Sequence, residues 1–270
     1  MTEQELTAAR FCDLSRRAYD NNYVTHTDFL TGAEQSLLQE LQMGRIADRR
    51  LAPAAVVLLG GWDEADRKVA CFLPDYEDPA SFPMEELAAM SRGEGIITCL
   101  RIAPLQKQFA DSLTHRDYLG ALMNLGIERS LIGDILVDRA SAEAVIFVMS
   151  DMASVVTQEL TRVKHTSVSV SAADPAAVDI RPEFEERTGS VASERLDAVV
   201  AFAYRLARGK AQKLIEAEHV LVGGRPVLSG GSQLKPGDRV TVKGFGKFIF
   251  DGIEHETKKG RLMVRIRLFR

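Results

Sequence analysis

Residues 193–243 read SERLDAVVAFAYRLARGKAQKLIEAEHVLVGGRPVLSGGSQLKPGDRVTVK, and this stretch decides the C-terminal fold. Apolar residues recur at helical spacing near its start and predict an amphipathic helix over 194–205. These residues are Leu196, Val199, Val200 and Ala203. A second helix is expected over 208–217, with its apolar side chains turned toward the same core. The stretch therefore predicts a pair of packed helices at the head of a small domain.

Turn signals divide the rest of the C-terminal segment into short strands. Strands at 220–222 and 225–227 should flank Gly223-Gly224, a pair that is typical of a tight hairpin. A strand at 239–243 and a hairpin made from 244–251 and 262–268 should complete the sheet. We therefore expect a domain over 193–270, preceded by a linker at 176–192 that is rich in alanine and charge.

Charge is distributed unevenly along the 270 residues. Residues 193–270 carry 16 Lys and Arg against 8 Asp and Glu, whereas residues 1–192 carry 18 against 30. A basic segment on an otherwise acidic chain suggests an anionic partner for the basic end. The alternative is a solvated surface that is merely uneven in charge.

Basic and aromatic residues of the C-terminal segment supply the candidate contacts to this anionic partner. Arg208 and Lys210 open the second helix, where the helix dipole disfavours cations unless an anion binds with them. Farther on, basic and aromatic residues interleave over 243–248. Most of the phenylalanines there should pack in the core, but Phe245, between two glycines, is the candidate for base stacking. The predicted RNA contacts are Arg195, Arg208, Lys210, Lys213, Lys243, Phe245 and Lys247.

The upstream chain predicts two further regions. An N-terminal α/β region over 1–80 should contain helices at 3–20 and 31–47 and strands at 54–59 and 69–73. Thr31 and Glu34 form a capping-box pattern at the second helix. Residues 81–175 follow the order strand, helix, strand, strand, helix, strand, which is the split βαβ pattern of RRM and ferredoxin-like domains. The aromatic residues that stack bases in RNA-recognition domains are not evident on its strands. The expected fold class is α+β.

Residues 193–243 resemble the S-four (alpha-L) RNA-binding domain of ribosomal proteins and RNA-modifying enzymes. The resemblance rests on Arg195-Leu196-Asp197, Arg208, Ala211, Leu214-Ile215, Val220, Val222, Pro236-Gly237-Asp238 and Val240. Three positions depart from the pattern. Ala207 stands where serine is usual, Glu218 where glycine is usual, and Gly223-Gly224 where Asn-Gly is common. Glycine accepts a positive φ, so the turn change is harmless, whereas Glu218 would weaken contact with RNA locally.

Other blocks of the sequence are similar to the YlmH family. The N-terminal block is Gly60-Gly61-Trp62 through Arg67 with 72–76, the middle block is 113–120, 125–127 and 132–135, and the C-terminal block is 244–248. The resemblance implies a cytoplasmic, non-enzymatic RNA-binding protein that associates with the large ribosomal subunit. It also implies a role in rescuing stalled ribosomes that carry peptidyl-tRNA, and an older association with cell division.

No catalytic or metal-binding pattern stands out in the sequence. His115-Arg116-Asp117 imitates a kinase triplet, but no asparagine follows at the required distance and no glycine-rich loop occurs. Two interpretations of the triplet stay open: Asp117 and His115 are polar groups at a helix start, or His115 and Arg116 form a secondary contact to RNA or ribosomal protein. The five histidines have no metal-ligand spacing, and the three cysteines suit neither a disulfide framework nor a zinc site. We expect no enzyme, no cofactor, no metal, no small-molecule substrate and no membrane span.

One alternative function stays open. The chain could be a protein-interaction adaptor linked to cell division or photosystem assembly. An RNA binder should gather its predicted cations on one continuous face, whereas a scattered arrangement would favour the adaptor.

Overall fold

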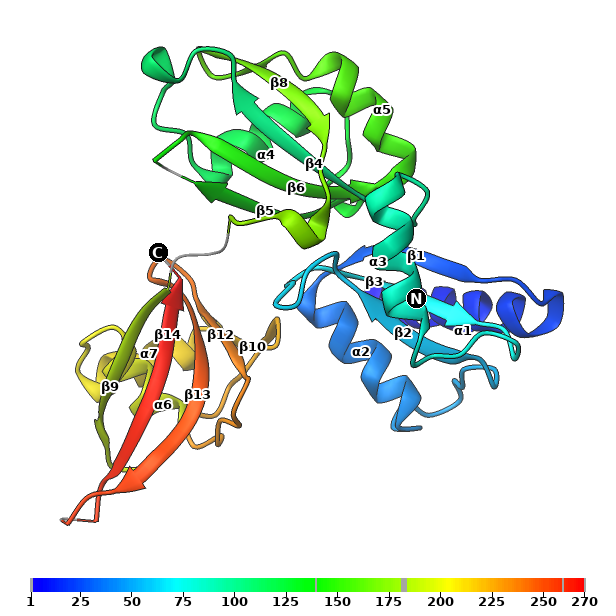
Figure 1. Ribbon diagram of the computed structural model, residues 1–270. Helices are drawn as coiled ribbons and strands as arrows, with labels where there is room; N and C mark the ends of the chain where they lie inside the picture. Colours follow the sequence, from blue (N-terminus) through cyan, green and yellow to red (C-terminus); the bar gives the residue numbers. More distant parts are fainter. Residues whose placement is uncertain (1, 139, 181–183, 259, 270) are drawn as a thin grey trace. The chain divides into compact units, whose positions relative to one another are not determined.

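The computed structural model describes residues 2–138, 140–180, 184–258 and 260–269. The chain divides into two compact units, Met1–Arg181 and Pro182–Arg270, and each unit mixes helices with antiparallel sheets (Figure 1). The predicted α+β class is therefore confirmed.

The N-terminal region of the first unit is a three-stranded antiparallel sheet with two helices. Its elements are α1 (Glu3–Asn21), β1 (Thr25–Leu30), α2 (Gly32–Gln42), β2 (Ala55–Leu59) and β3 (Lys68–Leu73), with the strand order β1-β3-β2. Phe11 of α1 and Leu38 of α2 pack on Phe72 of β3 in one buried cluster. The predicted capping box is present, because the Glu34 amide donates to Thr31 Oγ1 (3.3 Å) and the Thr31 amide donates to Glu34 Oε2 (2.7 Å).

Strand β1 has no counterpart among the predicted elements. Two of its buried positions are threonines, so the usual apolar alternation is absent from the sequence. Thr25 Oγ1 donates to the Leu14 carbonyl (2.8 Å), and Thr27 Oγ1 accepts from the Ala70 amide (3.0 Å). Hydrogen bonds to the backbone thus make these buried hydroxyls tolerable.

The central region of the first unit has the predicted split βαβ topology. Its main elements are α3 (Phe82–Arg92), β4 (Ile97–Pro104), α4 (His115–Asn124), β5 (Ile132–Asp138), β6 (Glu143–Met149), α5 (Ser150–Glu159), β7 (Arg162–Val163) and β8 (Thr166–Ala172), with short 3-10 turns at Lys107–Phe109, Arg129–Leu131 and Pro175–Ala177. The strand order is β5-β6-β4-β8-β7, and all the pairs are antiparallel. Helices α4 and α5 cover one face of this sheet through Tyr118, Leu122 and Val156 (Figure 1).

The other face of the central sheet packs against the N-terminal region. One buried cluster joins Phe29 and Val69 of the N-terminal sheet to Cys99 and Phe147 of the central sheet, and Phe147 is fully buried. In RNA-recognition domains, aromatic residues on the sheet stack bases. Here the aromatic residue Phe147 belongs to the core, so its ring is not available for stacking.

Two of the sequence blocks shared with the YlmH pattern meet at this junction. Asp134 on β5 accepts hydrogen bonds from Trp62 Nε1 (3.0 Å) and from the backbone amides of Asp66 (2.7 Å) and Arg67 (3.2 Å). The Arg67 side chain donates to the carbonyls of Phe29 (2.7 Å) and Ile132 (2.9 Å). These blocks therefore hold the turn after β2 on the edge of the central sheet.

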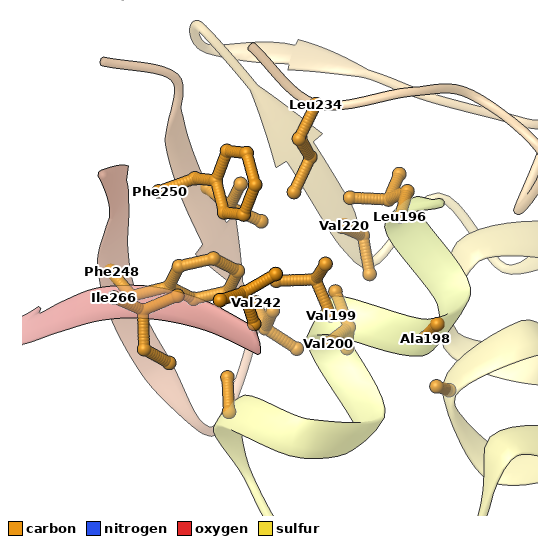
Figure 2. Packing of buried hydrophobic residues seen from close by; sticks show 14 of the residues in the cluster. Leu196, Ala198, Val199, Val200, Val220, Leu234, Val242, Phe248, Phe250 and Ile266 are labelled. Carbon is orange, nitrogen blue, oxygen red and sulfur yellow. The ribbon is translucent and has the colours of Figure 1, made fainter. Parts of the chain in front are cut away.

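The second unit is a six-stranded antiparallel sheet with two helices. Its elements are β9 (Phe184–Val191), α6 (Leu196–Ala203), α7 (Arg208–Glu216), β10 (Val220–Val222), β11 (Arg225–Pro226), β12 (Arg239–Val242), β13 (Gly246–Glu256) and β14 (Leu262–Phe269). The strand order is β11-β10-β12-β13-β14-β9. Figure 2 shows Val199 and Val200 of α6 pointing toward Phe248 of β13 and Ile266 of β14, all in one buried cluster.

Strand β9 lies in the segment that the sequence analysis assigns to a linker at 176–192. It pairs with β14 along its whole length, from Phe184 opposite Phe269 to Val191 opposite Leu262. The Arg187 side chain also donates to the carbonyl of Ala203 at the end of α6 (2.6 Å). The secondary structure expected for this segment is thus corrected, while the domain boundaries given above stay predictions.

Candidate nucleic-acid interface

Helix α7 presents its basic side chains to solvent because its apolar residues face the core. Ala211 and Ile215 are fully buried, whereas Arg208, Lys210 and Lys213 are exposed. Residues three apart lie on the same side of a helix, so Lys210 and Lys213 project together. The sequence predicted this division of the helix correctly.

A buried aspartate fixes two of the predicted arginines. Asp197, only 4% exposed in the first turn of α6, accepts two hydrogen bonds from Arg195 (both 3.2 Å) and two from Arg208 (3.0 and 3.2 Å). Burial raises the pKa of Asp197, but the hydrogen bonds from Arg208 and Arg195 outweigh it and hold the pKa below its ordinary value. The arginine side chains remain about half exposed (44% and 51%), so each guanidinium is oriented without being enclosed.

This ion-pair network changes the sequence argument for the start of α7. An anion does accompany Arg208 there, but it is the carboxylate of Asp197. The position of Arg208 therefore does not by itself call for a phosphate. The sequence signal for Asp197 was its place in Arg195-Leu196-Asp197, which carried the resemblance but gave no hint of the pairing.

The turn between β12 and β13 lies beside α7. Phe245, 40% exposed, lies under Lys210, whose Nζ is 5.6 Å from the ring centroid. Tyr204 packs on the same ring, and the centroids of Tyr204 and Phe245 are 5.5 Å apart. Lys243 is exposed in the same turn. We call the group of Arg195, Arg208, Lys210, Lys213, Lys243 and Phe245 the cationic helix surface.

Lys247 does not belong to the cationic helix surface. Successive side chains of a strand point to opposite faces, and the next residue, Phe248, is buried against the helices. Lys247 instead lies over the ring of Phe269 on the outer face of the sheet, with Nζ 5.0 Å from the centroid. Burial lowers the pKa of Lys247 to about 8. An RNA contact by Lys247 stays a prediction, and it would involve a different face of the unit.

The predicted secondary contact lies in the first unit. His115 begins α4 and is exposed. Its pKa lies below the usual value, mainly because the ring is partly desolvated and also because Arg129 is positively charged. Arg116 is exposed beside it. Asp117 caps the helix by accepting from Thr114 (2.9 and 2.7 Å) and pairs with Lys164 (2.9 Å). Asp117 is thus a polar group at the helix start, as the first of the two interpretations expects, and it forms a capping box with Thr114.

Glu218 occupies a backbone conformation that suits glycine. Its φ is +57°, and the backbone amides of Glu218 and His219 donate to the carbonyls of Ile215 and Leu214. This is the Schellman arrangement at a helix end, in which glycine is usual. We expect Glu218→Gly to raise the free energy of unfolding of the second unit by about 1 kcal/mol, because a left-handed conformation strains other residues.

Thermal and urea unfolding would measure this gain, with Glu218→Ala as the matched control. Alanine removes the same charge but keeps a Cβ. An equal gain from both variants would show that the charge of Glu218, and not its backbone, is the cause.

The described residues contain neither a metal-ligand cluster nor a membrane span. In that part of the chain, no three His, Cys, Asp or Glu side chains come together in a way that would hold a metal ion. None of the helices described is both long and apolar enough to cross a bilayer.

Family models match the central region and the C-terminal region of the chain. Residues 97–176 match the family model described as "Putative RNA-binding domain in YlmH", and residues 194–240 match the S4 domain. The "Ribosome-associated protein quality control protein P2" of Bacillus subtilis (strain 168) is 31% identical over 242 residues, which are 88% of this chain and 84% of that protein. The solved structure of "Cell division protein ylmH from Streptococcus pneumoniae" superposes with a TM-score of 0.45 and 22% identity, covering 64% of this chain and 92% of that one.

The family matches lie where the sequence motifs predicted them. The S4 match spans α6, α7 and the cationic side chains on them, and the YlmH match spans the split βαβ region. Identity with the Bacillus protein extends over most of both chains. The chain belongs to the YlmH family of RNA-binding proteins with a C-terminal S-four domain.

Proposed function

We propose that this protein is a non-catalytic cytoplasmic factor that binds structured RNA of the large ribosomal subunit, and peptidyl-tRNA, on stalled ribosomes. The observation that carries the proposal is the cationic helix surface. Its cations come from three segments of the chain. Asp197 links Arg195 to Arg208 at the start of α7, and Phe245 lies under Lys210. Lys213 is in the last turn of α7, and the Lys243 amide donates to the carbonyl of His219, just after the helix. Such a gathering favours an RNA binder over the adaptor.

The chemistry of this surface suits the RNA backbone better than individual bases. Lysine and arginine neutralise phosphates and release counterions, which gives affinity and a strong dependence on salt. Each of the two arginines donates from Nε and Nη2 to Asp197, which fixes the orientation of its guanidinium group, and we assign the Nη1 side to contact with a phosphate oxygen. Selectivity would then come from the shape of the RNA, because a helical RNA is read mostly through its backbone and 2′-hydroxyls.

The proposed association with the ribosome is supported by the Bacillus relative, because the name of that protein places it in ribosome-associated quality control. The acidic part of this chain, residues 1–192, carries 30 Asp and Glu against 18 Lys and Arg. We therefore assign it to contact with protein or to positioning of the basic domain, with His115 and Arg116 as a secondary contact. We propose that residues 1–80 and 81–175 carry these roles, and that residues 193–270, together with strand β9, form the basic RNA-binding domain.

The test is RNA binding as a function of salt by the full chain and by Lys210→Ala/Lys213→Ala. Neither lysine takes part in the Asp197 network, so the fold of the unit should be kept. We expect at least a tenfold loss of affinity for purified large-subunit rRNA and a salt slope that is shallower by roughly one to two, as two phosphate contacts disappear. Co-sedimentation with large ribosomal subunits should weaken in parallel.

The matched control is Arg45→Ala/Arg50→Ala, which removes the same charge from two exposed positions in the first unit. Its affinity and salt slope should equal those of the wild type. Equal losses in both variants would mean that net charge and not the cationic helix surface binds RNA. A wild-type chain that binds neither rRNA nor ribosomes would favour the adaptor.

A further inference from the structure

The hydroxyl of Tyr204 is buried beside the cationic helix surface. Tyr204 caps the C-terminus of α6, and within the described part of the chain no hydrogen-bond partner reaches its hydroxyl oxygen. Burial raises the pKa of this tyrosine to about 12, although the charge of Arg187 acts in the opposite direction. A buried polar group without a partner loses the hydrogen bonds that water would give it, so a phenylalanine would serve the fold as well or better.

The hydroxyl lies under a turn in which glycines flank an aromatic residue. A Cβ on Gly246 would be 3.8 Å from the Tyr204 oxygen, so the hydroxyl faces the Phe245-Gly246 segment. Gly244 and Gly246, with φ values of +83° and +123°, flank Phe245 on both sides. The Phe245 ring is 40% exposed and packs on Tyr204 at 5.5 Å. Because the ring is partly exposed, it can turn away by rotating about its own side-chain bonds, while the Phe245 amide keeps its bond to the Val242 carbonyl (3.0 Å).

We propose that Phe245 leaves Tyr204 to stack on an RNA base, and that the uncovered Tyr204 hydroxyl donates a hydrogen bond to an oxygen of the RNA backbone. The oxygen belongs either to a phosphate or to a ribose 2′-hydroxyl, both of which accept such a bond. Lys210, over the same ring, and Lys243, in the same turn, place positive charge where that backbone would lie. The inference rests on the proposed function, because it needs RNA on the cationic helix surface.

Tyr204→Phe tests the proposal, because this change should lower the affinity for RNA without lowering the thermal stability of the protein. Affinity for a synthetic RNA stem-loop should fall about threefold to tenfold, as one hydrogen bond is lost. The midpoint of thermal unfolding should stay the same or rise, because the hydroxyl has no partner among the described residues of the free protein. A merely structural tyrosine would leave affinity unchanged.

Tyr118→Phe is the matched control. Tyr118 is also buried, but its hydroxyl donates to the Ala142 carbonyl at 2.6 Å. This variant should unfold at a lower temperature and bind the stem-loop as the wild type does. The same chemical change would thus lower stability at one tyrosine and RNA affinity at the other.

A stem-loop with 2′-deoxy sugars identifies the acceptor. If Tyr204→Phe weakens binding of the RNA but not of the deoxy version, the acceptor is a 2′-hydroxyl; if it weakens both, the acceptor is a phosphate. Wild-type affinity for the RNA in Tyr204→Phe, or a lowered unfolding temperature, would overturn the inference and leave the proposed function standing. If the wild-type chain binds no RNA, both fall together.

Discussion

Gly61→Ala is expected to lower the free energy of unfolding of the first unit by roughly 2–5 kcal/mol, the sum of a left-handed backbone penalty and of overpacking. Gly61 has a φ of +84°, and a Cβ added there would lie 2.3 Å from Cδ1 of Phe147. Phe147 cannot move aside easily, because it is fully buried in the core between the N-terminal and central regions. Urea unfolding of the full chain, followed by far-UV circular dichroism, measures the loss.

Gly93→Ala separates the two causes. Gly93 has a similar φ of +73°, but in the described part of the chain, its own immediate neighbours aside, no atom lies within 4 Å of the Cβ that it would gain. This variant should lose only the backbone part, about 1–2 kcal/mol. Equal losses at both glycines would show that Phe147 does not press on the turn.

Asp134→Ala should destabilise the same unit by about 2–4 kcal/mol, because three donors that are worth roughly 1 kcal/mol each lose their acceptor. These donors are the indole of Trp62 and the backbone amides of Asp66 and Arg67. Trp62 is the only tryptophan of the chain, so its fluorescence reports directly on this contact. The emission should shift in the folded variant, and the urea midpoint should fall.

Asp138→Ala is the comparison from the same strand. Asp138 also accepts from a nearby turn, through the Ala140 amide (2.9 Å) and the Ser141 hydroxyl (2.6 Å), and both of these donors belong to the central region. We expect a smaller loss of stability and an unchanged tryptophan spectrum. If Asp134→Ala instead kept wild-type stability and lost RNA binding, Asp134 would be a ligand contact and not a structural one.

The elements with strong apolar periodicity could be predicted from the sequence. The two helices around Arg208 and the split βαβ order follow from apolar spacing and turn residues, and both are confirmed. Strands β1 and β9 could not be predicted, because neither is stabilised mainly by alternating apolar residues. Thr25 and Thr27 bury hydroxyls that bond to the backbone, and the residues of β9 are mostly polar and pair with β14, which lies far along the chain.

The candidate site could be predicted in its residue types but not in its contacts. Exposure of Lys210 and Lys213 follows from the helix period, and the burial of Phe248 and Phe250 follows from the alternation of β13. Lys247 is close in sequence to Lys243 and Phe245, which suggests a shared surface. However, side chains alternate along a strand, and Lys247 lies on the opposite face. The pairing of Asp197 with Arg208 depends on the loop between α6 and α7, and helical spacing does not predict where that loop places Arg208.

Strand β9 has a practical consequence for any attempt to divide the chain. A fragment that starts at Ser193, where the recognisable motif begins, would leave out the strand that covers the edge of β14. An uncovered long strand offers its unpaired amides and carbonyls to other molecules and invites aggregation. Such a fragment would also lack Arg187 and its bond to the end of α6. The smallest piece that keeps the whole sheet therefore begins ahead of Phe184, and insolubility of a shorter piece would say nothing about how well this domain folds by itself.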